Sequence, residues 1–441
     1  MIYRHLFSLL ILLTVTACGA DTVALPESDL LAANTPETAV TPTPEIIPSA
    51  TAVTAASPTL PPPATLPPQP TTAPSPTPES GFYPPPGREF ATLDEFWDGQ
   101  AEWYLEIHDT GLPIGESETI YRGDNVLWSY LHASYQSAGV HDQCGDPVEF
   151  PGCTTLWTSS DSGRSFQLEE PVCLFPCESC PCDHRRDHIG QQQYPRVFFT
   201  HDLAYLVYEF GAYNYIRVSL DGLNWSSHEH VPGTWIWTWP YGPCRDQEII
   251  FPHPHIHYEL QYNCLAGGPP GIFIDEDDML YVFVALGQAP GHMGCFKGNR
   301  YADISTMRPC DTPYLFKADN DTYGPVDLLG PAANPYFEFR TISSAAVVRV
   351  GNRFYMTYEG IRGPSSFTVV DDQFALGLAR SVGPEIDGPW EKYPGNPIIM
   401  DLPGNVGVGH ADFLLVNGAT YLYTTTLEGT RGRYVLLRRN S

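Results

Sequence analysis

Two glutamates stand in matching sequence contexts that suit acid–base chemistry. Glu209 and Glu359 each follow a Tyr-x-x-Tyr pattern, at 205–208 and at 355–358, where an apolar, strand-like stretch ends. Two carboxyl groups can share acid–base work when one is protonated and the other is ionised. We therefore take Glu359 and Glu209 as the candidate catalytic pair. The alternative is structural, in which each glutamate only closes a hydrogen bond to a neighbouring strand.

Further polar and aromatic residues suit ligand binding. Arginine offers a rigid fork of donors for a carboxylate or for hydroxyl groups, and histidine can position an ion or a water molecule. The alternating tryptophans of 235–239 place indoles on one side of an extended segment, either as core packing or as a stacking platform. The candidate binding residues are Arg196, Arg340, His410, Asp412, Trp235 and Trp237.

The composition of the chain indicates which elements can position these residues. The chain has 441 residues and a formal net charge of -28. With Lys+Arg 23 against Asp+Glu 51, the chain lacks the basic stripe that nucleic-acid-binding proteins need. We therefore expect no nucleic-acid partner. The 44 Pro, 38 Gly and 25 Tyr favour a turn-rich β protein over a helical bundle.

The first 80 residues predict export and tethering. An apolar run in 1–18 is too short to span a bilayer and ends in Val15-Thr16-Ala17-Cys18, which resembles the lipobox of bacterial lipoproteins. That resemblance implies lipidation of Cys18 and an extracytoplasmic protein at the bacterial cell surface, held to the membrane by acyl chains. An ordinary secretory signal is the alternative. Residues 19–80, rich in Pro, Thr and Ala, predict a disordered tether.

Residues 81–441 repeat one strand–turn–strand pattern five times. The copies begin near residues 119, 196, 271, 344 and 412, and the last contains the hairpin signal Asn417-Gly418. Sheets of this kind bury both faces when packed radially. We predict an all-β, five-bladed β-propeller, with residues 103–107 as the outer strand that closes the ring. A β-sandwich of several meanders is the alternative.

The long connections fall on one face of such a ring, and ten cysteines lie in them. An exported protein favours disulfides between them, with Cys144–Cys153 and Cys295–Cys310 as guessed local pairs. A zinc site at Cys177, Cys180, Cys182 and His184 is the alternative for that cluster. The alternating histidines of 253–257 are either a metal or substrate-binding edge or plain polar surface.

Two motifs resemble known propellers. The segment Ser159-Ser-Asp161-Ser-Gly163-Arg-Ser165-Phe166 resembles the Asp-box of sialidases and other propellers, where it is structural. Residues 379–398, with Asp387-Gly388-Pro-Trp390, look like the blade end of five-bladed glycosidases of families 43 and 32. Gly407-Val-Gly409-His410 resembles a family 43 segment whose histidine points into the central channel. No cofactor follows from the residues themselves, and the resemblance leaves room for Ca²⁺ or another ion there.

The chain departs from family 43 where catalysis would lie. It contains no Glu-Gly-Pro for the general acid, and the start of the first repeat reads Glu116-Ser117-Glu118 in place of a catalytic Asp. We expect a monomeric, carbohydrate-active protein that hydrolyses a glycosidic bond of an oligo- or polysaccharide in the axial funnel. One alternative is a non-catalytic propeller that binds glycans or proteins. The other is a sialidase-like enzyme, but the sequence has no arginine triad in matching motifs.

Overall fold

The fold is taken from a computed structural model of the chain. It describes residues 81–440, except 114, 116, 133–139, 142–146, 149–152, 176–191, 211–212, 236–265, 287–291, 318–336, 339–340, 362–373, 401–410 and 427–428. The predicted signal segment 1–18, with Cys18, and the tether 19–80 lie outside these residues. No helix of the described part is long and apolar enough to cross a membrane.

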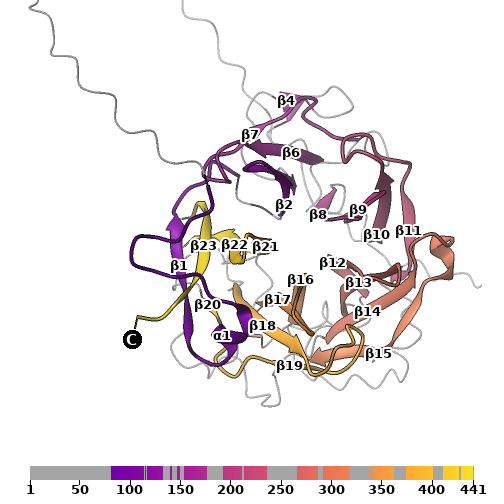
Figure 1. The fold of residues 1–441 in the computed structure, drawn as a ribbon. Coiled ribbons are helices and arrows are strands. Elements are labelled where there is room, and N and C mark those ends of the chain that lie inside the picture. The colour runs from indigo at the N-terminus through magenta and orange to yellow at the C-terminus, as the bar shows by residue number, and fades with distance from the viewer. Residues whose placement is uncertain are drawn as a thin grey trace, which may run out of the picture. The chain divides into compact units, whose positions relative to one another are not determined.

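Five antiparallel sheets follow one another around a central axis (Figure 1), which confirms the predicted five-bladed propeller. Blade one consists of β2 (Ser117–Gly123), β3 (Val126–His132), β6 (Thr154–Ser159) and β7 (Gln167–Leu168). Blade two consists of β8 (Gln193–Phe199), β9 (Ala204–Phe210), β10 (Tyr213–Ser219) and β11 (Glu229–Trp235). Blade three consists of β12 (Ala266–Ile274), β13 (Met279–Leu286), β14 (His292–Asn299) and β15 (Arg308–Lys317).

The last two blades complete the ring. Blade four consists of β16 (Thr341–Val350), β17 (Arg353–Ile361), β18 (Phe374–Ser381), β19 (Trp390–Lys392) and the short β20 (Ile399–Met400), which pairs with β18. Blade five consists of β21 (Asp412–Val416), β22 (Ala419–Thr425), β23 (Arg431–Arg438) and β1 (Ala101–Ile107). Outside the blades lie α1 (Leu93–Trp97), the 3₁₀ helix η2 (Ile304–Thr306) and the small ribbon β4 (Val140–His141) with β5 (Pro147–Val148).

Ring closure uses strands from the two ends of the described chain. β1 pairs antiparallel with β23, from Ala101 opposite Arg438 to Ile107 opposite Arg433, as the sequence predicted. Just before β1, helix α1 begins with a capping box in which Thr92 and Glu95 exchange hydrogen bonds. The helix buries Leu93 and Phe96 among side chains of blades four and five. Residues 92–107 therefore stabilise blade five.

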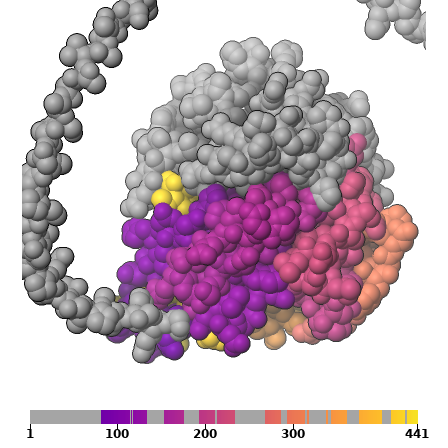
Figure 2. Space-filling view, turned by 90° about the horizontal axis from the view of Figure 1, so that it is seen from above, coloured from indigo at the N-terminus to yellow at the C-terminus, as the bar shows by residue number. Residues whose placement is uncertain are grey.

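The hydrophobic core is divided among the junctions between blades. Each junction holds its own cluster of buried side chains, for example Tyr130 with Leu206 between blades one and two and Phe273 with Met356 between blades three and four. Three similar clusters fill the other junctions. The side view in Figure 2 shows the indigo-to-magenta residues of the first blades lying against their pink neighbours. The radial packing thus buries both faces of each small sheet.

The Asp-box has its expected structural role. Asp161 Oδ1 accepts from the backbone N–H groups of Arg164 and Ser165, at 3.0 Å each, and Asp161 Oδ2 accepts from the Ser165 hydroxyl at 2.7 Å. Phe166 is buried and meets the Tyr423 ring edge-on at 5.9 Å. Asp221 organises the shorter turn after β10 in the same way. Both carboxylates thus hold turns.

Two disulfides lie among the described residues. Cys295 pairs with Cys310, as guessed from the sequence, but the two residues lie in β14 and β15 and not in a loop. Cys153 pairs with Cys173, so the guessed pair Cys144–Cys153 is wrong. The reason is geometric: Cys153 directly precedes β6, and the chain returns beside that strand after β7, where the N–H of Leu174 donates to the Thr154 carbonyl at 3.0 Å.

Candidate active site

The inner strands bring polar residues together at one end of the ring. In Figure 1, β2, β8, β12, β16 and β21 surround the axis. Because these strands are equivalent and run in the same direction along the axis, their first residues share one face. The connections between second and third strands, and those between blades, leave from described strand ends on that same face. Glu118, Arg196 and Asp412, each near the start of an inner strand, therefore lie at this face.

Arg196 is the centre of this cluster. Its side chain comes from β8 of blade two and is almost completely buried. Nη1 donates to the Ser117 carbonyl at 3.0 Å and to Glu118 Oε2 at 3.2 Å, both on blade one. Nη2 donates to the Ser344 hydroxyl at 3.0 Å and to the Ala411 carbonyl at 3.1 Å. One guanidinium thus joins blades one, two and four and the residue before β21 of blade five.

Matching bulges shape the strands around Arg196. The register between β8 and β9 shifts between Gln193 and Arg196, and that between β16 and β17 shifts between Ser343 and Ala346. Tyr194 and Ser344, inside these bulges, have φ of 56° and 55°, a left-handed conformation that is uncommon outside glycine. Bulges re-aim side chains next to functional sites. Here the bulge in blade four holds the Ser344 hydroxyl against Arg196.

Glu118 is the carboxyl group with the most unusual environment in this cluster. Its side chain is 16% exposed and lies beside the Arg196 guanidinium at 3.2 Å. Burial raises the pKa of Glu118 to about 8, the Asp412 carboxylate adds to the rise, and Arg196 opposes it. A carboxyl with such a pKa is protonated at neutral pH and can donate a proton.

Glu359 and Glu209 occupy equivalent places in two blades. Glu359 lies opposite Ser343 in β16, and Glu209 lies opposite Gln193 in β8, in both cases just before the bulge. Glu359 is 1% exposed, and its Oε2 accepts from the Ser343 hydroxyl at 3.2 Å. Since Ser343 is next to Ser344, which bonds to Arg196, Glu359 belongs to the wall of the same cluster. The catalytic roles of Glu359 and Glu209 stay predictions.

Asp412 lies in the seam between blades five and one. It is completely buried, and its Oδ1 accepts from Arg431 Nη2 at 2.7 Å and from the Ser117 hydroxyl at 2.9 Å. Its Oδ2 accepts from the Thr119 N–H at 2.8 Å. Both oxygens therefore bind protein donors that orient the start of β2. Asp412 fixes the strand that carries Glu118, and its predicted contact with substrate stays a prediction.

The remaining predicted site residues cannot be placed. Arg340, His410, Trp237, the cysteine cluster of 177–182 and the histidines of 253–257 lie outside the described residues. Trp235 is described only by its backbone, which pairs with Tyr213 at the end of β11. For the ion expected in the central channel, the described part of the chain offers no group of three His, Cys, Asp or Glu residues that could hold a metal.

Sequence reasoning missed three members of the cluster as functional groups. Glu118 was noted because it stands where a catalytic Asp was sought, and it was not taken as a candidate. Ser344 and Arg431 carried no signal, since Ser344 reaches Arg196 from a bulge in another blade and Arg431 reaches Asp412 past the intervening strand β22 of blade five. The one readable clue was a carboxyl, Glu118, as the second residue of the first inner strand.

Comparisons with known proteins give matches among solved structures. No family model matches the chain, and no curated protein matches it. Among solved structures, an α-L-arabinanase of Cellvibrio cellulosa in complex with arabinohexaose is 16% identical, with a TM-score of 0.45 over 74% of this chain and 92% of that chain. An endo-arabinase of Bacteroides thetaiotaomicron is 14% identical, with a TM-score of 0.44 over 77% of this chain and 98% of that chain.

An endo-1,4-β-xylanase of the same Bacteroides species is also 14% identical, with a TM-score of 0.44 over 75% of this chain and 92% of that chain. The chain is structurally similar, at low identity, to these glycoside hydrolases. These values are too low to carry a residue role or an activity from those proteins to this one.

Proposed function

We propose that the protein binds a carbohydrate chain at the axial end of the ring and hydrolyses a glycosidic bond there. The observation that supports this most is Glu118, a shielded carboxyl at the mouth whose pKa is raised to about 8. Glycoside hydrolysis requires one protonated carboxyl to assist the leaving oxygen and one ionised carboxylate on the other side of the bond.

In this proposal, Glu118 transfers its proton to the glycosidic oxygen as the bond to the sugar carbon breaks. Glu359 is the preferred ionised partner, with Glu209 as the equivalent group in blade two. Arg196 holds Glu118 in position through its contact at 3.2 Å and ties it to the Ser344 bulge beside Glu359. Water then supplies the hydroxyl group of the new reducing end and returns a proton to the site.

The test is turnover of plant and microbial polysaccharides by the purified protein. We expect reducing sugar to be released from at least one of arabinan, xylan, mannan and fructan. Glu118→Gln and Glu359→Gln should each lower the rate by about 10²-fold or more, because each removes a proton-transfer group. Glu89→Gln, an exposed carboxylate paired with Arg438, is the matched control and should retain full activity. Full activity of Glu118→Gln would refute this assignment.

A non-catalytic glycan-binding propeller is the second candidate. It is favoured by the Arg196 network, in which both terminal nitrogens already bind protein acceptors in a closed structural cluster. Binding and hydrolysis are separated by affinity electrophoresis in gels that contain each polysaccharide. Retardation of the wild type with no release of sugar on any substrate would decide for the binding module.

We also propose that the protein is a lipoprotein, anchored through Cys18 at the bacterial cell surface with residues 19–80 as the tether. The lipobox-like sequence supports this. Cys18→Ser should move the protein from the membrane fraction to the soluble fraction and abolish incorporation of labelled palmitate. A variant that still fractionates with membranes would contradict the anchor. We propose a monomer, to be checked by light scattering of the soluble variant.

A further inference from the structure

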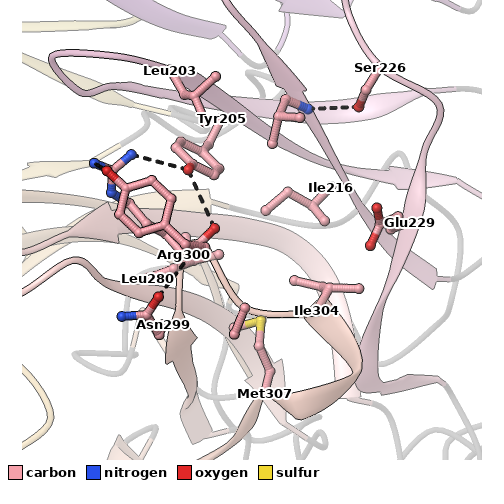
Figure 3. Close-up of a pocket in the computed structure, with 13 residues that line it drawn as sticks. Leu203, Tyr205, Ile216, Ser226, Glu229, Leu280, Asn299, Arg300, Ile304 and Met307 are labelled. Atoms are coloured by element: carbon pink, nitrogen blue, oxygen red, sulfur yellow. Dashed lines mark hydrogen bonds between the residues drawn. The ribbon is translucent and has the colours of Figure 1, made fainter.

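A cavity separate from the axial site lies between blades two and three. Its volume is about 310 Å³, and it is bordered by the turn before β9, by the end of β14 and by the connection that contains η2. These segments follow first and third strands, so they lie at the face opposite the starts of the inner strands. Figure 3 shows the cavity and its lining side chains. Its volume falls in the range of small-molecule pockets.

The walls of this cavity are mainly apolar. Ile216 of β10 and Leu280 of β13 face each other across the junction, and Ile304 and Met307 approach from the η2 connection. The Tyr205 ring completes this wall and is itself buried. Such walls favour an apolar body, since each buried methylene contributes about 0.8 kcal/mol to transfer from water.

Arg300 contributes no free positive charge to the cavity. Its side chain is fully buried, with Nη1 donating to Asp202 at 2.7 Å and Nε donating to Asp278 at 2.7 Å. Nη2 donates to the Tyr301 hydroxyl. The hydrogen bond from Arg300 holds the pKa of Asp202 well below its usual range, so both carboxylates offset the guanidinium. The wall around Arg300 therefore carries an excess of negative charge and does not suit an anion.

Glu229 stands at the other end of the cavity. It lies at the start of β11, opposite Ile216 of β10, and Figure 3 shows its carboxylate on the far side of Ile216 and Ile304 from Arg300. Within the described residues, this carboxylate has no hydrogen-bond or ion-pair partner. The lining thus combines an apolar interior with one carboxylate that is available to a ligand.

We infer that this cavity binds a small organic cation, an ammonium group on an apolar body about the size of a phenyl ring. The ammonium group pairs with Glu229, and the apolar body lies against Ile216, Ile304 and Met307. An alcohol of the same shape fits the walls but lacks the ion pair. A carboxylate of the same shape is repelled by Glu229 and by the acidic residues around Arg300. The inference does not depend on the axial site.

The test compares three probes of one shape on the whole protein: benzylammonium, benzyl alcohol and benzoate, measured by saturation-transfer NMR titration at low salt. We expect benzylammonium to bind about three- to fivefold more tightly than benzyl alcohol, as for an ion pair with an exposed carboxylate such as Glu229, and benzoate to bind most weakly. Equal binding of benzylammonium and benzoate, or no binding of benzylammonium, would overturn the inference.

Two variants locate the binding. Glu229→Gln should reduce the affinity for benzylammonium to that for benzyl alcohol and leave the alcohol unchanged, whereas Glu89→Gln should change neither. Ile304→Trp should fill the cavity and weaken both probes at least tenfold, with circular dichroism showing a folded protein. If Ile304→Trp fails to fold, Ile304→Phe serves the same purpose. Benzylammonium affinity that survives Glu229→Gln or the filling variant would contradict the proposed site.

Discussion

The buried ion pair between Asp412 and Arg431 of blade five should stabilise the seam with blade one, because both side chains also hydrogen-bond to Ser117. Both side chains are 0% exposed, and the pair is 2.7 Å long. Asp412→Ala leaves the Arg431 guanidinium buried without its counter-charge and also removes the acceptor of the Thr119 N–H and the Ser117 hydroxyl. Breaking such a pair costs about 3–5 kcal/mol, so we expect a loss of this size in the free energy of unfolding.

The assay is urea denaturation followed by tryptophan fluorescence. Arg431→Met should be similarly unstable, but the double variant should be more stable than the sum of the two single losses predicts, by about 1–3 kcal/mol, because no buried charge remains unpaired. Glu276→Gln, which breaks an exposed pair with Arg349, is the control and should cost less than about 1 kcal/mol. Strictly additive losses, or an Asp412→Ala variant as stable as the control, would refute this reasoning.

Three further predictions concern stability. The pKa of Glu118 is raised from 4.5 to about 8, so between these values the folded state binds a proton that the unfolded state releases. This contribution to stability is lost as the pH rises from about 5 to 8. The difference in melting temperature between wild type and Glu118→Gln should therefore shrink or reverse over that range, and a constant difference would contradict the prediction. Asp161→Ala removes four hydrogen bonds of the Asp-box turn and should cost about 1–3 kcal/mol, whereas Ser165→Ala should cost less. Leu93→Ala, in the buried face of α1, should cost about 2–5 kcal/mol in the same denaturation assay, and a loss below 1 kcal/mol would show that α1 does not stabilise blade five.

The blade pattern was readable from the sequence because it is local. Alternating apolar stretches with tight turns, such as Asn417-Gly418 between β21 and β22, specify a hairpin through neighbouring residues alone. Even the pairing of 103–107 with the last strand could be predicted, because blade five lacked an outer strand. Helix α1 was not predicted, since at five residues it has no apolar periodicity and depends on its capping box and on packing.

The site was less readable because it depends on contacts between blades. The positions of Arg196 and Asp412 at the axial end follow from strand direction. Their partners do not, because Ser344 reaches Arg196 through a bulge and Arg431 of β23 reaches Asp412 of β21 past the intervening β22. The raised pKa of Glu118 results from burial by the assembled ring, which no single blade specifies. Cys153 likewise pairs according to the path of β6 and β7, not according to spacing.

The pairing of β1 with β23 sets an order of events during synthesis. The ribosome makes residues 101–107 more than 320 residues before 431–438, so β1 waits without its partner while blades one to four emerge. Blade five and the axial cluster, which needs Ala411 and Asp412, can assemble only once the final strand has left the exit tunnel. A nascent chain stalled before residue 431 therefore contains the carboxyl of Glu118 but not the closed ring that shields it.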